Sequence, residues 1–319
     1  MSGYSEIEPL LVERLFEPFL DPVDGSLCVP AQTSLGEIHA RASAEGLRFP
    51  LALDPNASLA QHLDAALHAP ACHRFGPYCD NVMGMNWCLP DGTILRIGER
   101  VAKTTTGYDW LRFLLHSGKR FGEATHYVIR LRPDCGFSAV AHIEGDAGRL
   151  RACVTALLRG AWMHWWDSID YLPREDGGTV RVGVHCPRRE SAAFETELRR
   201  VAGEQGLQMH WQPDEPAPWP GLPDFALKTT PDRVLQLAAD VARRGATDVV
   251  AFCYHGVVHG RVGREGVVDT VQALVRSVEA GLTELGGEWH SRHGVPRVSA
   301  EPEQRWMAVL GPVLRGRSG

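Results

Sequence analysis

Two hydrophobic periods alternate along the second half of the chain, and this alternation constrains the fold more than any other feature. The run TVRVGVHC has period two, so Val180, Val182 and Val184 share one face of a strand. The runs FSAVAHIEG, TDVVAFC and VVHGRV are also typical of strands. Helical spacing is found between them, at Leu150, Cys153, Val154, Leu157 and Leu158, at Phe194, Leu198 and Val201, at Val234, Leu237, Ala238 and Val241, and at Val271, Leu274, Val275, Val278, Leu282 and Leu285. We therefore expect an α+β domain with helices on one face of an antiparallel sheet.

The first part of the chain carries shorter strands and helices. The run SLCVPA, which begins at Ser26, is typical of a strand. A helix is predicted from Ser34, because Ser34 and Glu37 form the pattern of a capping box. Gly46 ends this predicted helix, as glycine commonly does at a helix C-terminus.

A hairpin and a further strand complete the first part. Asp91 and Gly92 stand between two strand-like runs, which is a strong signal for a tight hairpin. The run THYVIRLRP reads as another strand that ends at Pro133. Because the pattern changes here, we place a domain boundary near residue 134, which gives domains at 1–134 and 135–319.

Composition and charge exclude several classes of function. The 319 residues are enough for two domains, and a net charge of -6 gives no electrostatic footprint for nucleic acid. No run of apolar residues is long enough to span a membrane, and the acidic N-terminus does not resemble a signal peptide. The eight cysteines form no C-x-x-C pair, so we expect free thiols in the cytoplasm.

The run from Arg74 to Pro133 resembles a known flavoprotein family. It reads RFGPYCDNVMG, then LPDGTILRIGERVAKTTTGYDWLRFLL, then HSGKRFGEATHYVIRLRP. This resembles the second half of the flavin domain in the FAD-linked oxidase superfamily, of the vanillyl-alcohol-oxidase or PCMH type. The resemblance is strongest to the smaller FAD-domain subunit of glycolate oxidase. It implies a partial PCMH-type FAD-binding domain followed by a cap domain.

The resemblance also implies which residues contact the cofactor. The matching positions that would bind FAD are Gly76, Asp80, Gly84, Lys103, Gly107, Tyr108, Asp109, Ser117, Gly122 and Thr125. The resemblance does not identify the catalytic residues, and we expect no metal site.

The chain departs from the family pattern at the loops that hold phosphate. Such loops use glycine because the backbone must approach the phosphate closely. No loop of the Ser-Gly-Gly-Thr kind precedes the strand at Ser26, so the first phosphate loop is expected to be missing. At the second loop, Gln61 and His62 stand where the family has glycines, within a segment whose pattern predicts a helix. In the third motif, the family's Gly, Gly and Thr are replaced by His116, Lys119 and Arg120.

Lys119 and Arg120 have two interpretations. Basic side chains are able to contact a diphosphate in place of lost backbone amides, or they belong to a solvated turn. Cys79 stands where the family commonly has Arg. Whether the chain binds FAD is therefore left open by the sequence.

Two further groups of residues are candidates for a metal site or a ligand pocket. His255 and His259 are a weak metal pair, because residues four apart on a strand lie roughly 13 Å from each other. Core or cleft histidines are the favoured interpretation. Trp162, Trp165 and Trp166 either line a flat pocket or pack in the core.

Two functional hypotheses follow. The first is a flavoprotein subunit that oxidises a small 2-hydroxy acid such as glycolate, with FAD as its cofactor. The second is a flavin-free scaffold or regulatory subunit that binds a catalytic paralogue. Either one predicts a protein partner or a homo-oligomer, and the cysteine spacing predicts no iron–sulfur cluster.

Overall fold

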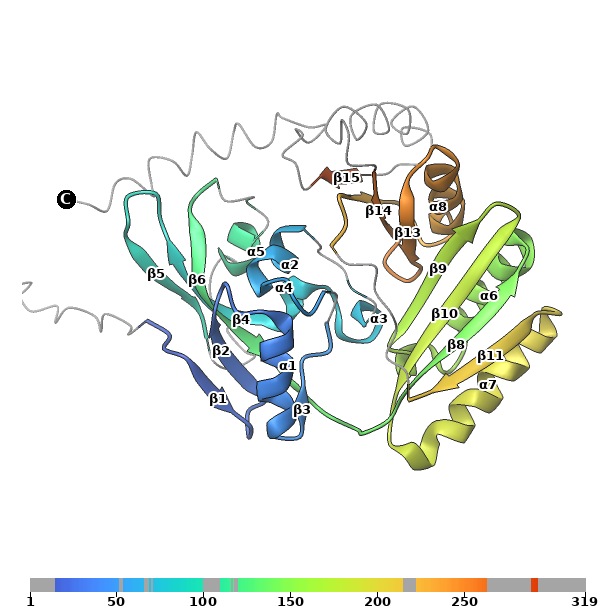
Figure 1. Cartoon of the computed structure of the whole chain (residues 1–319), viewed down its shortest axis with the longest axis horizontal. Helices are drawn as coiled ribbons and strands as arrows, with labels where there is room; N and C mark the ends of the chain where they lie inside the picture. The colour runs from blue at the N-terminus through green and yellow to red at the C-terminus, as the bar shows by residue number, and fades with distance from the viewer. Residues whose placement is uncertain are drawn as a thin grey trace, which may run out of the picture.

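Two antiparallel sheets make up most of the structure. The computed structural model describes residues 15–51, 54–65, 69, 71–99, 110–115, 117, 120–214, 222–262 and 288–291. Residues from the first part of the chain form a five-stranded sheet, and later residues form an eight-stranded sheet beside it (Figure 1). The fold is thus α+β, as the sequence predicts. The predicted domain boundary at residue 134 lies between the last strand of the first group and the first strand of the second.

The five-stranded sheet has the order β1-β2-β6-β4-β5. Its strands are β1 (Phe19–Asp21), β2 (Ser26–Pro30), β4 (Val82–Cys88), β5 (Ile94–Gly98) and β6 (Glu123–Arg130). A second, two-stranded sheet pairs β3 (Leu47–Arg48) with β7 (Arg132–Pro133). The helices of this region are α1 (Leu35–Ala44), α2 (Leu59–Ala65), α3 (Cys72–Phe75), α4 (Tyr78–Asn81) and α5 (Trp110–Leu115). Buried side chains from these helices and from β2, β4 and β6 form one hydrophobic core.

The eight-stranded sheet has the order β11-β8-β10-β9-β13-β14-β12-β15. Its strands are β8 (Ser138–Gly145), β9 (Ser168–Arg174), β10 (Gly177–His185), β11 (Gln208–Pro213), β12 (Phe225–Lys228), β13 (Thr247–Phe252), β14 (Val257–Arg261) and β15 (Glu288–Ser291). Three helices cover one face of the sheet (Figure 1): α6 (Ala147–Arg159), α7 (Ser191–Glu204) and α8 (Val234–Arg243). Short 3-10 turns, η1 (Met163–Trp165) and η2 (Arg188–Glu190), precede β9 and α7. Val180, Val182 and Val184 point into the core under the helices, as their period predicts.

The local signals in the sequence produce the expected elements. Ser34 caps α1, and its hydroxyl accepts a hydrogen bond from the backbone N–H of Glu37. The Asp91-Gly92 hairpin joins β4 to β5, whose residues pair in antiparallel register. The helix predicted over residues 271–285 lies outside the described residues.

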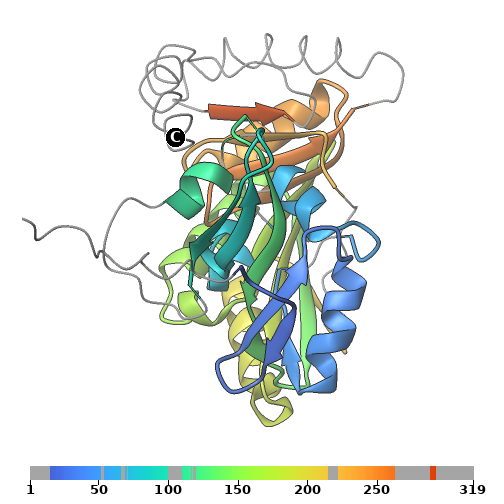
Figure 2. The same ribbon diagram turned by 90° about the vertical axis from the view of Figure 1, so that its left-hand side faces the viewer.

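The face of the eight-stranded sheet that the helices leave open turns toward the first region, and α3 lies at the seam between them (Figure 1). Figure 2 shows the molecule from the side of the first region. Two hydrogen bonds fix α3 there: Nε2 of His255 bonds the Cys72 carbonyl at 2.8 Å, and Nε2 of His73 bonds the Met163 carbonyl at 2.6 Å. Within the described ranges, no helix combines the length and apolar character that a membrane crossing needs.

Candidate functional site

The segment that the resemblance assigns to a phosphate loop is the helix α2. A capping box begins this helix: the Ser58 N–H donates to Oε1 of Gln61 at 2.8 Å, and the Gln61 N–H donates to the Ser58 hydroxyl at 3.2 Å. The next residue, His62, is fully buried. Its Nε2 accepts from the Asp54 N–H at 3.0 Å, so its Nδ1 carries the proton and donates to the Ser58 carbonyl at 2.8 Å. The two residues that replace glycine therefore hold the helix in place.

The backbone amides at the start of α2 all have partners within the protein. The N–H of Leu59 donates to the Thr33 carbonyl at 2.9 Å, and the N–H of Ala60 donates to the Ala31 carbonyl at 2.9 Å. The next two amides, of Gln61 and His62, donate to the hydroxyl and the carbonyl of Ser58. A phosphate cradle works by offering free N–H groups. This segment offers none from residues 59–62.

A small cavity lies beside α2. Its volume is about 20 Å³, which is room for a single water molecule and not for an aromatic ring system. The wall is formed by Gln32, Ala60, Leu63, Asp64, Trp87, Leu114, Leu115, Glu123, Ala124 and Tyr127. All of these residues except Gln32, which lies in the turn after β2, come from α2, β4, α5 and β6, so the cavity lies between the second and third motifs of the resemblance.

Three of the predicted cofactor residues lie close to this cavity and are used by the fold. The Ser117 hydroxyl donates to the Leu114 carbonyl at 2.7 Å, which closes α5. Gly122 has a φ of +119°, and a Cβ there would overlap the carbonyl oxygen of Cys88. The Thr125 hydroxyl donates to the Asn86 carbonyl at 3.4 Å.

Three others lie elsewhere. Asp80 accepts a hydrogen bond from Arg112 at 2.6 Å and so joins α4 to α5. A Cβ on Gly76 would meet the Asp80 carboxylate at 2.8 Å, and a Cβ on Gly84 would meet the Phe16 ring at 2.9 Å. The remaining four predicted residues, Lys103, Gly107, Tyr108 and Asp109, lie outside the described residues, as do His116 and Lys119. The predicted set is thus spread over several elements.

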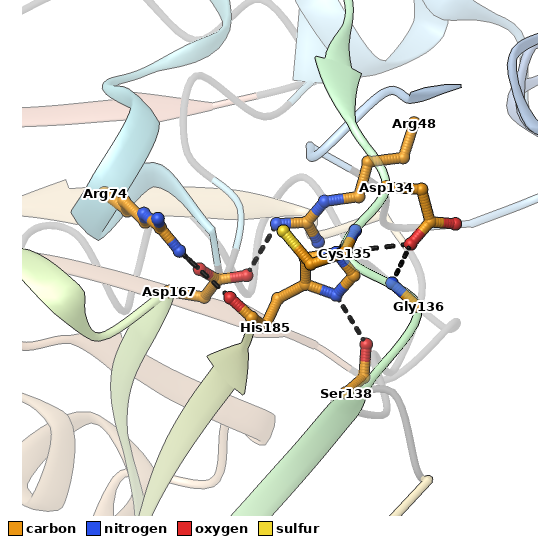
Figure 3. A network of polar contacts seen from close by, with 8 residues as sticks. All are labelled: Arg48, Arg74, Asp134, Cys135, Gly136, Ser138, Asp167 and His185. Carbon is orange, nitrogen blue, oxygen red and sulfur yellow. Dashed lines mark hydrogen bonds and ion pairs between the residues drawn. The ribbon is translucent and has the colours of Figure 1, made fainter. Parts of the chain in front are cut away.

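The seam between the two regions holds a group of charged side chains that contact one another. Arg48 and Arg74 approach Asp167 from two sides, at 2.9 and 3.0 Å (Figure 3). Nη1 of Arg74 also donates to the His185 carbonyl at 3.1 Å. Because these residues come from β3, α3 and β10, the pairs tie the first region to the eight-stranded sheet.

His185 fixes the segment that links the two regions. Its Nε2 accepts from the Cys135 N–H at 2.9 Å, so the proton is on Nδ1, which lies 2.9 Å from the Ser138 hydroxyl (Figure 3). Burial lowers the pKa of His185, and Arg48 lowers it further. Ser138, His185 and Asp134 do not form a nucleophilic triad. Nε2 of His185 already accepts from the Cys135 N–H, and the Asp134 carboxylate lies 3.3 Å from that same nitrogen.

The comparisons with known proteins agree with the fold and with the resemblance. No known family profile matches the chain. It is 30% identical over 105 residues to the mitochondrial D-lactate dehydrogenase [cytochrome] of Arabidopsis thaliana, which is 33% of this chain and 18% of that protein. It is 31% identical over 86 residues to an uncharacterized FAD-linked oxidoreductase of Mycobacterium tuberculosis, which is 27% of this chain and 19% of that protein.

The solved structure of an alkyldihydroxyacetonephosphate synthase superposes on 96% of this chain and 64% of that one, with a TM-score of 0.64 at 11% identity. The matched proteins include D-lactate dehydrogenases and FAD-linked oxidoreductases, which supports the resemblance to the FAD-linked oxidase superfamily. The matched stretches span less than a fifth of each of these two relatives. The activities of the relatives are therefore not assigned to this chain. The finer likeness to a glycolate oxidase subunit stays a prediction.

The FAD of this superfamily would need a site for its diphosphate among the residues present. The second phosphate loop of the resemblance is a capped helix whose first amides are bonded internally, and the adjacent cavity admits one water. The described residues therefore do not fit an FAD diphosphate in the way that the superfamily pattern implies. Among the described residues, no group of three or more His, Cys, Asp or Glu is placed to hold a metal ion either.

The sequence contains no signal for Asp167, the central residue of the seam. Asp167 lies 119 residues from Arg48 and 93 from Arg74, and no local pattern connects them. For the tryptophan cluster, core packing was one of the two interpretations, and it holds for Trp166. This side chain is buried and packs with Trp162 and Phe194 in the core. Trp165 is 53% exposed and takes no part in that packing.

Proposed function

We propose that the chain is a flavin-free member of its superfamily that serves as a scaffold or regulatory subunit for a catalytic relative. The state of α2 is the observation that carries this proposal. A diphosphate needs several free N–H groups at close range, and in residues 59–62 these groups are already bonded to carbonyls and to a hydroxyl. Freeing them requires that the capping box and the His62 contacts be broken.

The edge of the five-stranded sheet supports a protein partner. Strand β5 pairs only with β4 within the described part of the chain, and Ile94 at its start is 42% exposed. Unpaired edge strands readily add a strand from another chain. Because the relatives are FAD-linked oxidoreductases, a full-length flavoprotein of the same superfamily is the partner that we expect.

A second function is favoured by the sequence matches. The 30% identity over 105 residues to a D-lactate dehydrogenase supports flavin-dependent oxidation of a small 2-hydroxy acid such as lactate or glycolate. In that case FAD would supply the hydride acceptor, and this chain would supply orientation and electrostatics.

One experiment separates the two functions. The full chain is purified, its visible flavin absorbance is recorded, and FAD is then titrated by isothermal calorimetry. We expect a colourless protein with no stoichiometric FAD uptake. In a second step it is mixed with an FAD-loaded oxidoreductase of the same organism and run on a sizing column, where we expect a stable complex.

Retention of one FAD per chain would instead refute the flavin-free proposal. Bleaching of that flavin by D-lactate or glycolate without oxygen would then support the oxidase. A protein that takes up no FAD and forms no complex with the flavoprotein would contradict both functions.

A further inference from the structure

Three arginines surround one phenylalanine ring at the seam. The guanidinium carbons of Arg48, Arg74 and Arg132 lie 5.5, 5.3 and 5.3 Å from the centroid of the Phe75 ring. One such cation–π contact is ordinary in a protein. Three such contacts around a single ring bring three like charges into a small volume, and this arrangement requires a separate explanation.

The charges of this cluster, Arg48, Arg74 and Arg132 around Phe75, do not balance. Asp167 pairs with Arg48 and Arg74, whereas Arg132 pairs with no carboxylate in the described part of the chain. Three cations and one anion leave two positive charges. Asp134, the nearest acid along the chain, lies 3.3 Å from Nε2 of the neutral His185 ring and forms no ion pair with any of the three arginines.

The backbone places two of the like charges opposite each other. Arg48 on β3 is the direct cross-strand partner of Arg132 on β7, an arrangement that destabilises a sheet. Burial lowers the pKa of Arg132, and the nearby Arg130 and Arg74 lower it further. The fold therefore holds these cations together against their mutual repulsion.

Two donor atoms of the cluster have no hydrogen-bond acceptor among the described residues. They are the buried Nε atoms of Arg48 and Arg132. The side chains of Arg48 and Arg74 are 18% and 27% exposed, so a small ion is able to reach them from solvent. Guanidinium groups bind planar or tetrahedral oxyanions through paired N–H donors.

We propose that Arg48, Arg74 and Arg132 form a binding site for a small oxyanion that carries two negative charges, such as inorganic phosphate or a short dicarboxylate. The ion would neutralise the two uncompensated cations and accept from their terminal N–H groups. The site is formed by β3, α3 and β7 at the seam, apart from α2 and its cavity, and it does not depend on whether FAD is bound.

The test uses the full chain and four proteins. Phosphate, and in a parallel arm malonate, is titrated by isothermal calorimetry at constant ionic strength set with chloride. The variants are Arg132→Gln, which removes the charge, and Arg132→Lys, which keeps the charge but not the guanidinium fork. Arg244→Gln is the matched control, because Arg244 is an exposed arginine at the end of α8, in the eight-stranded region.

We expect saturable binding to the natural protein and to R244Q, at least tenfold weaker binding to R132Q, and intermediate binding to R132K. Tenfold corresponds to about 1.4 kcal/mol. Tighter binding of phosphate than of malonate would identify the tetrahedral ion as the preferred ligand, and the reverse order would identify the dicarboxylate. Failure of the natural protein to bind either ion saturably would overturn the proposal, and so would equal binding by R132Q.

Discussion

Replacement of Asp167 by asparagine tests the seam most directly. The carboxylate is 9% exposed and accepts from Arg48 at 2.9 Å and from Arg74 at 3.0 Å. The substitution keeps the shape but removes the charge that two half-buried guanidinium groups share, and it leaves three cations around Phe75. Removal of one partner from a buried ion pair costs about 3–5 kcal/mol. Since both arginines retain some solvent contact, we expect a smaller loss, of about 2–3 kcal/mol.

The assay is thermal unfolding in chloride buffer without phosphate. For a protein of this size, 1 kcal/mol shifts the midpoint by roughly 2–4 °C, so D167N is expected to melt about 5–10 °C lower. Asp214→Asn is the control, because the Arg188–Asp214 pair is exposed at 66% and 57% and contributes at most about 1 kcal/mol. A midpoint for D167N within 1 °C of that for D214N would refute the argument that Asp167 holds the seam together.

Two further perturbations have definite signs. Gly122→Ala should destabilise the protein by more than 3 kcal/mol, because its Cβ would overlap the Cys88 carbonyl, whereas Gly136→Ala should cost about 1 kcal/mol, since it also has positive φ but has open space around it. Urea midpoints would measure the difference, and equal losses would contradict the packing role of Gly122. Stability should also fall as pH drops below about 6.5, because several buried histidines have lowered pKa values and the unfolded chain therefore binds more protons. These are His39, His62, His73, His185, His255 and His259. Asp170, whose pKa burial raises to about 6, opposes the trend below that pH, so a higher urea midpoint at pH 5.5 than at pH 7.5 would show that the acid outweighs the histidines.

Local signals in the sequence were sufficient for most elements of the fold. The helix after Ser34 and the hairpin at Asp91 follow from capping and turn chemistry that acts over only a few residues. The α+β arrangement of the second part follows from the two hydrophobic periods, because each period exposes one apolar face that needs a partner layer. Such features are encoded within short windows of sequence.

The helix α2 was also predictable, although its consequence was not. Its apolar spacing indicates a helix where the superfamily has a glycine loop, and the helix Leu59–Ala65 is confirmed. Ser58 and Gln61 carry the S-x-x-Q pattern of a capping box, as Ser34 and Glu37 carry the related pattern, but no local pattern reveals that both ring nitrogens of His62 are used. Those contacts depend on Ser58 and Asp54 adopting one turn, which is a property of the folded chain.

The seam could not be predicted because its contacts join residues far apart in the chain. Arg48, Arg74 and Asp167 look like ordinary surface charges when read singly. The pairing appears only after two sheets have packed against α3, and the charge excess appears only once β3 and β7 have aligned Arg48 with Arg132. Long-range registers of this kind leave no local signature in one sequence.

The glycines offer a physical means to separate constraints of the fold from constraints of a cofactor. Gly76, Gly84 and Gly122 match the superfamily pattern, and at each a Cβ would meet the Asp80 carboxylate, the Phe16 ring or the Cys88 carbonyl within the protein itself. At Gln61 and His62, where the pattern has glycines that approach phosphate, side chains are present and make structural hydrogen bonds. A chain under both constraints would need glycine at both kinds of position. This chain has glycine where its own packing requires it and side chains where a diphosphate would require glycine, which is the distribution expected if the fold, and not the flavin, sets these residues.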